Sequence, residues 1–104
     1  MKRVAFKMKL KPGVIEEYTR RHNEIWPELT ELLKENGVSE YSIFFDEETN
    51  SLLAYQINSS DGGSQSLGAE PIVQKWWDYM SDLMEVNPDN SPVSKELPEV
   101  FFLQ

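Results

Sequence analysis

The chain contains one histidine, His22, within the segment RRHNEIWPEL that runs from Arg20 to Leu29. Imidazole has an ordinary pKa of about 6.5, so it can gain and lose a proton near neutral pH. Tyr18 lies one helical turn earlier, so a phenol and an imidazole would project from one patch of a helix. Such a pair suits general acid–base catalysis. The alternative is a hydrogen-bonded histidine at the edge of the core, without a catalytic role.

Pro27 interrupts the helical pattern five residues after His22. Proline has no N–H for the carbonyl of Asn23, and its ring crowds that carbonyl, so the helix should kink around His22 and Asn23. Irregular backbone beside an ionisable group is common in functional sites. Pro27 is equally compatible with a helix that merely bends around the core, or with a new helix that begins at the proline.

Further aromatic side chains could bind a small polar ring. Trp76 and Trp77 are adjacent, so their indoles would point about 100° apart on a helix, one into the core and one at its edge. The functional alternative is an apolar platform, with N–H donors at its edge, that suits the C–H faces of a sugar. Tyr41 would supply another phenol, or simply pair across strands with an aromatic neighbour.

Several kinds of chemistry lack the residues that they need. The chain has no cysteine, which excludes disulfides and thiolate catalysis. One histidine with scattered carboxylates is a poor source of the roughly three or four ligands of a zinc site, so no metal is predicted. There is no P-loop, dinucleotide-binding or nucleophile-elbow motif, and no cofactor is expected. A pocket with one imidazole, phenols and indoles suits proton transfer on a small hydroxylated substrate.

Composition limits the class of protein. The chain has 104 residues, enough for a single domain over residues 1–104 and too few for two. Its net charge of -8 would repel the phosphate backbone of a nucleic acid. The longest late apolar run, Val100 to Leu103, is far shorter than the roughly 20 residues of a membrane helix, and no signal peptide is evident. We therefore expect a soluble, cytoplasmic protein without nucleic-acid or membrane partners.

Hydrophobic periodicity predicts the elements that position these residues. In order they are a strand over 4–10, a helix from 14 to the Asn36-Gly37 stop, a hairpin of strands 41–46 and 52–57, a loop over 59–71, a helix over 72–84, a loop over 87–98 and a strand over 100–103. The order β-α-β-β-α-β predicts a ferredoxin-like α+β fold, an antiparallel sheet with helices on one face. A second copy of the chain is the simplest cover for the other face, so we expect a homodimer.

Three stretches together resemble the L-rhamnose mutarotase family: YTRRHNEIWPEL at 18–29, QKWWDYM at 74–80 and NPDNSPVSKEL at 87–97. With the first strand and the Tyr41 strand in matching order, the resemblance covers nearly the whole chain. It implies a ferredoxin-like fold of the dimeric α/β barrel type and a homodimer. It also implies an isomerase that interconverts the α and β anomers of L-rhamnose, in rhamnose metabolism, without cofactor or metal.

Carried over residue by residue, the resemblance implies that His22 is the catalytic proton donor and that Tyr18, Tyr41, Trp76 and Trp77 contact the sugar. We expect His22 to protonate the ring oxygen while Tyr18, Tyr41 or a bound water acts on the anomeric hydroxyl. Trp76 and Trp77 would hold the pyranose.

The chain departs from the family pattern in one loop. Asp61-Gly62-Gly63-Ser64 stands where family members carry a charged and aromatic segment of a Glu-Arg-Trp type, so the order of the 59–69 loop and access to the pocket are in question. Two other functions stay open on the same scaffold. One is a cofactor-free oxygenase or cyclase, and the other is a binding module that holds a small aromatic molecule or haem through His22 and the tryptophans.

Overall fold

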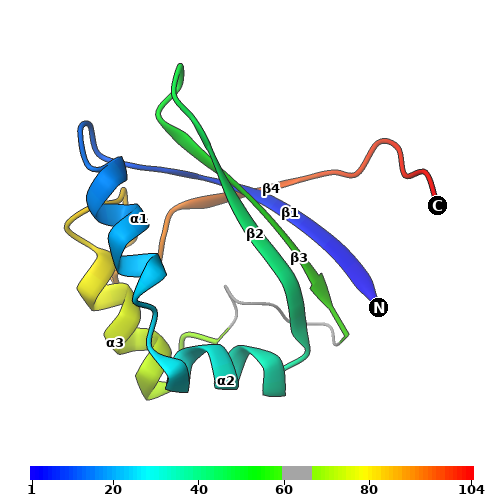
Figure 1. Ribbon diagram of the computed structural model, residues 1–104, viewed down its shortest axis with the longest axis horizontal. Coiled ribbons are helices and arrows are strands. Elements are labelled where there is room, and N and C mark those ends of the chain that lie inside the picture. The colour runs from blue at the N-terminus through cyan, green and yellow to red at the C-terminus, as the bar shows by residue number, and fades with distance from the viewer. Residues whose placement is uncertain (60–66) are drawn as a thin grey trace.

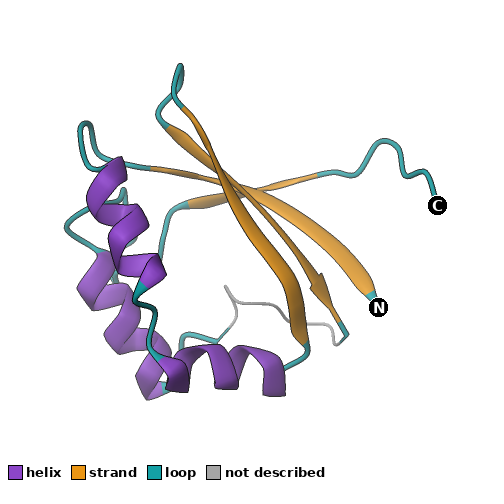
Figure 2. Ribbon diagram, viewed as in Figure 1, coloured by secondary structure: helices purple, strands orange, loops and turns teal. Residues whose placement is uncertain are grey.

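A computed structural model describes residues 1–59 and 67–104 (Figure 1). Its elements are β1 (Lys2–Lys9), α1 (Ile15–Asn23), α2 (Pro27–Glu35), β2 (Val38–Asp46), β3 (Ser51–Asn58), α3 (Pro71–Met80) and β4 (Ser94–Leu97). The strands form one antiparallel sheet in the order β2-β3-β1-β4, and Figure 2 shows all three helices on one side of it. The predicted α+β architecture is confirmed. The unusual loop segment Asp61–Ser64 lies outside the described residues.

The β2–β3 hairpin and β1 form where the alternating pattern predicts them. β1 is central and pairs with β3 from Lys2 to Lys9. Its inward side chains Phe6 and Met8 are each 4% exposed, because every second residue of a strand points to the same face of the sheet. The turn after β1 contains Gly13 at φ 75°, a left-handed conformation that glycine adopts without steric cost.

The prediction of one kinked helix from residue 14 to 36 is wrong, and the alternative of a new helix at Pro27 is confirmed. α1 ends at Asn23, and Trp26 is extended at φ -65° and ψ 128°. Pro27 then occupies the first turn of α2, where its missing N–H leaves no hydrogen bond unmade. The chain changes direction between the two helices (Figure 1).

The last strand was also predicted at the wrong place. β4 is Ser94–Leu97, inside the stretch predicted as a loop, and it pairs with Ala5–Met8 of β1. Pro98 follows and has no N–H for a further rung of the ladder. Val100–Leu103, predicted as the strand, runs away from the sheet with side chains that are 51–93% exposed (Figure 1). β4 lacks an apolar alternation because it is a mostly exposed edge strand.

The hydrophobic core lies between the helices and the inner face of the sheet. Its buried members come from all layers: Phe6, Met8, Leu10, Tyr18, Leu29, Leu52, Ala54, Val73, Trp76, Trp77, Met80, Leu83 and Met84. α3 ends at Met80, earlier than predicted, although Leu83 and Met84 still pack into this core. Within the described residues, no helix is both long enough and apolar enough to span a bilayer.

Candidate active site

A cavity of about 780 Å³ lies between the three helices and the inner face of the sheet. Its lining includes all five site residues predicted from the sequence: Tyr18, His22, Tyr41, Trp76 and Trp77. They come from α1, β2 and α3, which are far apart in the sequence. The volume lies within the range of small-molecule sites, roughly 300–1,000 Å³. The fold therefore brings the predicted residues together, and their chemical roles remain predictions.

The imidazole of His22 is held by its own helix and by two aromatic rings. Its Nδ1 lies 3.2 Å from the carbonyl oxygen of Tyr18. Its ring stacks on the Tyr18 ring with centres 4.3 Å apart, and meets the Trp76 ring edge-on at 5.4 Å and 86°. A carbonyl can only accept a hydrogen bond, so Nδ1 carries the hydrogen and the lone pair of Nε2 is left for proton transfer.

Burial lowers the pKa of His22, because an apolar environment disfavours the charged imidazolium. The hydrogen bond to the Tyr18 carbonyl acts in the opposite direction but is the smaller effect. The imidazole is therefore neutral at neutral pH. Its conjugate acid, when formed, is stronger than free imidazolium and gives up its proton more readily.

The two phenols of the site differ in their surroundings. Tyr18 is 5% exposed, and burial, with a smaller contribution from nearby Tyr41, raises the pKa of its phenol well above the usual range. Tyr18 therefore keeps its proton and can serve as a hydrogen-bond donor, but not as a base. Tyr41 is partly buried on β2, with its ring 6.4 Å from that of Phe6.

A β-bulge directs Tyr41 toward the cavity. Ser39 pairs with Ile57 and Ser42 with Tyr55, so two residues, Glu40 and Tyr41, oppose one residue of β3. Glu40 has φ 47°, a left-handed conformation usually taken by glycine in such bulges. The extra residue shifts the alternation by one, which turns Tyr41 to the inner face of the sheet. The only trace of the bulge in the sequence is a step of three from Val38 to Tyr41, before Ile43 and Phe45 continue the alternation.

Both tryptophans of α3 are part of the core and of the cavity wall. Trp76 is 8% and Trp77 7% exposed, so neither indole lies at an exposed edge. The backbone at Gly68 lies against the Trp77 indole, since a Cβ placed there would come within 2.7 Å of its Cζ3 atom. The core-filling and platform interpretations are therefore compatible, because buried indoles also line the cavity.

Sequence reasoning missed several residues around the site. Trp26 meets Trp76 edge-on at 5.1 Å and stacks with Tyr79 at 5.6 Å. Asn90, in a left-handed conformation at φ 69°, lines the cavity and donates from Nδ2 to Asp78 Oδ1 at 3.0 Å. The position of Trp26 four residues after His22 and the turn-forming sequence around Asn90 were available signals.

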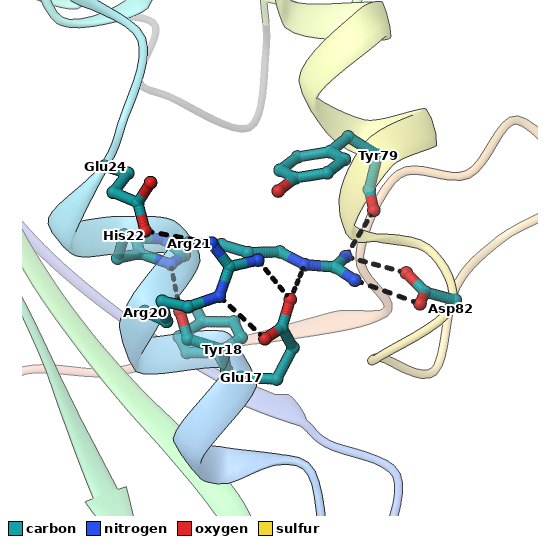
Figure 3. Close-up of polar contacts among 8 residues, drawn as sticks. All are labelled: Glu17, Tyr18, Arg20, Arg21, His22, Glu24, Tyr79 and Asp82. Carbon is teal, nitrogen blue, oxygen red and sulfur yellow. Dashed lines mark hydrogen bonds and ion pairs between the residues drawn. The ribbon is translucent and has the colours of Figure 1, made fainter.

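A network of ion pairs lies beside His22 on the outer side of α1 (Figure 3). Glu17 accepts hydrogen bonds from Arg20 at 2.6 Å and from Arg21 at 2.7 Å, which lower the pKa of its carboxyl to about 2. Arg21 also reaches Asp82, just beyond α3. Among the described residues, no group of three or more His, Cys, Asp or Glu side chains is arranged to hold a metal ion. Function without metal or cofactor stays a prediction from the sequence.

Comparison with known proteins identifies the family. The family model described as L-rhamnose mutarotase matches residues 3–103. The chain is 66% identical over 103 residues to L-rhamnose mutarotase of Bacteroides thetaiotaomicron, covering 99% of each chain. It is 62% identical over 104 residues to that of Formosa agariphila, covering 100% of both.

Solved structures agree with this comparison. A crystal structure of L-rhamnose mutarotase from Formosa agariphila matches with a TM-score of 0.93 and 58% identity over 100% of both chains. Rv0793 from Mycobacterium tuberculosis matches at a TM-score of 0.60 and 11% identity, covering 98% of this chain and 97% of its own, which supports the predicted ferredoxin-like fold alone. The chain belongs to the L-rhamnose mutarotase family.

Proposed function

We propose that this protein is an L-rhamnose mutarotase, an isomerase that interconverts the α and β anomers of L-rhamnose pyranose in rhamnose metabolism. The observation that carries the proposal is the cavity in which His22 lies beside two phenols and two buried indoles. An imidazole supplies proton exchange, and aromatic walls suit the C–H faces of a sugar. Family membership agrees with this chemistry.

Mutarotation opens a cyclic hemiacetal and closes it on the other face of the carbonyl. During opening, the anomeric hydroxyl loses its proton, the C1 carbonyl forms, the bond between C1 and the ring oxygen breaks, and the ring oxygen gains a proton. Closing reverses each transfer. One group must donate while another accepts, so the reaction needs an acid at the ring oxygen and a base at the anomeric hydroxyl.

We assign the ring oxygen to His22. Its protonated form donates to the ring oxygen during opening, and its neutral form takes the proton back during closure. The lowered pKa of His22 favours the neutral form and makes the imidazolium a stronger acid. Both protonation states are used in each cycle. The rate of ring opening should therefore fall as pH rises above the lowered pKa of His22.

The anomeric hydroxyl needs a different group. The raised pKa of Tyr18 keeps its phenol protonated, which leaves it as a hydrogen-bond donor to the sugar. A water bound beside Tyr41, which the bulge at Glu40 turns inward, is then the acceptor of the anomeric proton. Trp76 and Trp77 hold the pyranose between these groups.

Proton NMR exchange on an equilibrated L-rhamnose solution tests the proposal directly. One anomeric signal is saturated, and transfer to the other is measured with a trace of protein. Transfer well above the buffer background is expected, and a folded His22→Ala variant should lose about 10²–10⁴ in rate. Tyr18→Phe should reduce transfer or sugar affinity while the fold is kept. Absence of transfer for L-rhamnose would reject the proposal, and full activity of His22→Ala would reject the assignment of that residue.

We further propose that two copies form a homodimer through the sheet face opposite the helices. Phe44 is 64% and Leu53 39% exposed on that face, and the two residues are paired neighbours on β2 and β3, so their contiguous apolar surface suits an interface. Light scattering should give the mass of a dimer, and Phe44→Glu should give a monomer. A wild-type protein that is monomeric at every concentration would contradict this. A cytoplasmic location remains a proposal from the sequence.

A further inference from the structure

Arg21 connects the end of α1 to the end of α3. Its Nε donates to Oε2 of Glu17 at 2.7 Å, within α1. Its Nη1 donates to the carbonyl of Tyr79 at 2.6 Å and to Asp82 at 2.8 Å, and its Nη2 donates to Asp82 at 3.2 Å. Only 11% of the Arg21 side chain is exposed, whereas its partner Asp82 is 64% exposed, so the guanidinium is covered while its charge-assisted bonds to Asp82 still meet water. Figure 3 shows the guanidinium between the two carboxylates.

The same guanidinium begins a series of ring contacts that ends at His22. It lies 4.4 Å from the centre of the Tyr79 ring. Tyr79 stacks with Trp26 at 5.6 Å, and Trp26 meets Trp76 edge-on at 5.1 Å. Trp76 in turn meets His22 at 5.4 Å. Each contact restrains the next ring, because stacked and edge-on aromatic pairs have preferred geometries.

We propose that Arg21 is a positioning residue that holds the imidazole of His22 against Trp76. His22 follows Arg21 in the sequence, and α1 ends one residue later, at Asn23. The last turn of a helix opens more easily than its middle. The bonds from Arg21 to the end of α3 oppose that opening and fix the distance between the imidazole and the indole. The inference rests on the proposed function, since it assigns the proton transfer to His22.

Arg20 provides a matched control on the same helix. It carries the same charge, shares Glu17 as a partner and lies in the same last turn, so any effect of the helix dipole is common to both arginines. Its ion pairs are with Glu17 in α1 and with Glu24, the residue that caps α1, and its side chain is 52% exposed. It also hydrogen-bonds the Tyr79 side chain. Arg20 therefore lacks the bonds to Asp82 and to the α3 backbone that distinguish Arg21.

The first experiment compares rates of anomer exchange. Arg21→Gln should lower kcat by about ten- to a hundredfold, because a shift of the order of 1 Å at a reacting group has effects of that size. Sugar affinity should change little, since Trp76 and Trp77 remain on α3. Arg20→Gln should match the wild type. In a His22→Ala background, Arg21→Gln should cause no further loss, because Arg21 acts through the imidazole. An equal loss in that background would overturn the inference.

A second readout does not depend on activity. The chain has one histidine, so its imidazole proton signals belong to His22 alone. Its packed neighbours, Tyr18 on α1 and Trp76 on α3, carry no charge at neutral pH, and Arg21 and Arg20 are the cations of its own helical turn. If Arg21→Gln loosens the turn, the pKa of His22 should rise toward its ordinary value. Arg20→Gln removes an equal charge and should leave the titration unchanged.

Asp82→Asn serves as a second variant, in case Arg21→Gln does not fold. It weakens the same connection from the α3 side, at a side chain that is 64% exposed. The expected effects are those of Arg21→Gln, at smaller size. Wild-type kcat and an unchanged His22 titration in both variants would overturn the inference. A wild-type protein that shows no rhamnose exchange would instead reject the proposed function, while the titration would still test Arg21.

Discussion

Replacing Glu40 with glycine should stabilise the fold, although glycine usually weakens a strand. Glu40 has φ 47° in the bulge of β2, and a left-handed conformation costs a non-glycine residue about 1–2 kcal/mol. Glycine avoids this strain but adds roughly 0.5–1 kcal/mol of backbone entropy to the unfolded state. The net increase in unfolding free energy should be about 0.5–1 kcal/mol. For a domain of this size that corresponds to a rise in Tm of about 2–8 °C.

Ser42→Gly is the matched control. Ser42 lies on the same strand, is exposed, and is not among the residues with positive φ. Glycine there should lower the unfolding free energy by roughly 0.5–1 kcal/mol. Urea unfolding of the two variants and the wild type gives both values, with opposite signs expected. If Glu40→Gly is destabilised as much as Ser42→Gly, the left-handed bulge is not present in solution.

The same position tests how the bulge serves the site. Glu40→Val places a β-branched side chain at positive φ, where such residues are genuine outliers. Loss of the bulge would shift the alternation and turn Tyr41 to the outer face of the sheet. Rhamnose exchange should therefore fall in Glu40→Val and persist in Glu40→Gly. If Glu40→Val and Glu40→Gly have equal activity, the bulge is not required for the function of Tyr41.

Three further predictions follow from burial and charge. The unfolding free energy should fall as pH drops below about 6.5, because the lowered pKa of His22 lets the unfolded state bind that proton first. It should fall again between about pH 5 and 2, as Glu17, with its pKa of about 2, is protonated and loses its ion pairs with the arginines. Denaturant curves that do not change over this range would contradict the prediction. Leu52→Ala should lower the unfolding free energy by about 2–5 kcal/mol, because Leu52 is 1% exposed. A loss below about 1 kcal/mol would show that the surrounding core collapses around the smaller side chain. Trp26→Ala should weaken rhamnose affinity in an NMR titration, since Trp26 supports the edge of Trp76, and wild-type affinity would remove it from the site.

Much of the fold could be predicted because its signals are local. The alternation in β1 and in the hairpin places these strands, since one face of each must be buried. Local signals could not decide whether the helix kinks at Pro27 or a new helix begins there. The apolar spacing continues across it, and a proline fits both a kinked helix and the first turn of a new one. The outcome depends on where the second helix packs, which is a property of the whole chain.

β4 shows a different limit. An edge strand that is mostly exposed has no reason to alternate apolar and polar residues, so Ser94–Leu97 resembles a loop in sequence. The apolar run Val100–Leu103 resembles a strand, yet it lies beyond Pro98 and beyond the last residue pair that β1 and β4 form, Ala5 with Leu97. Hydrophobic periodicity indicates which side chains are buried, but it does not indicate which backbone segment pairs with a neighbouring strand.

The candidate site follows a similar division. His22 and Tyr18 are paired by helical spacing, and Trp76 and Trp77 by adjacency, so the sequence alone could group them. The connection from Arg21 through Asp82 joins residues 61 positions apart, and no local pattern reports it. Ion pairs of this kind are visible only once α1 and α3 are placed in space.

Three breaks in regular structure lie at the cavity. α1 ends one residue after His22, the bulge falls at the residue before Tyr41, and a left-handed turn places Asn90 at the cavity wall. A continuous helix would set Trp26 four residues above His22 on the same face, whereas the extended backbone at Trp26 lets its ring reach Trp76 and Tyr79 instead. Irregular backbone of this kind persists only where surrounding contacts hold it. The aromatic series from Arg21 to His22 provides those contacts on the α1 side, so the same residues that stabilise the break also support the imidazole.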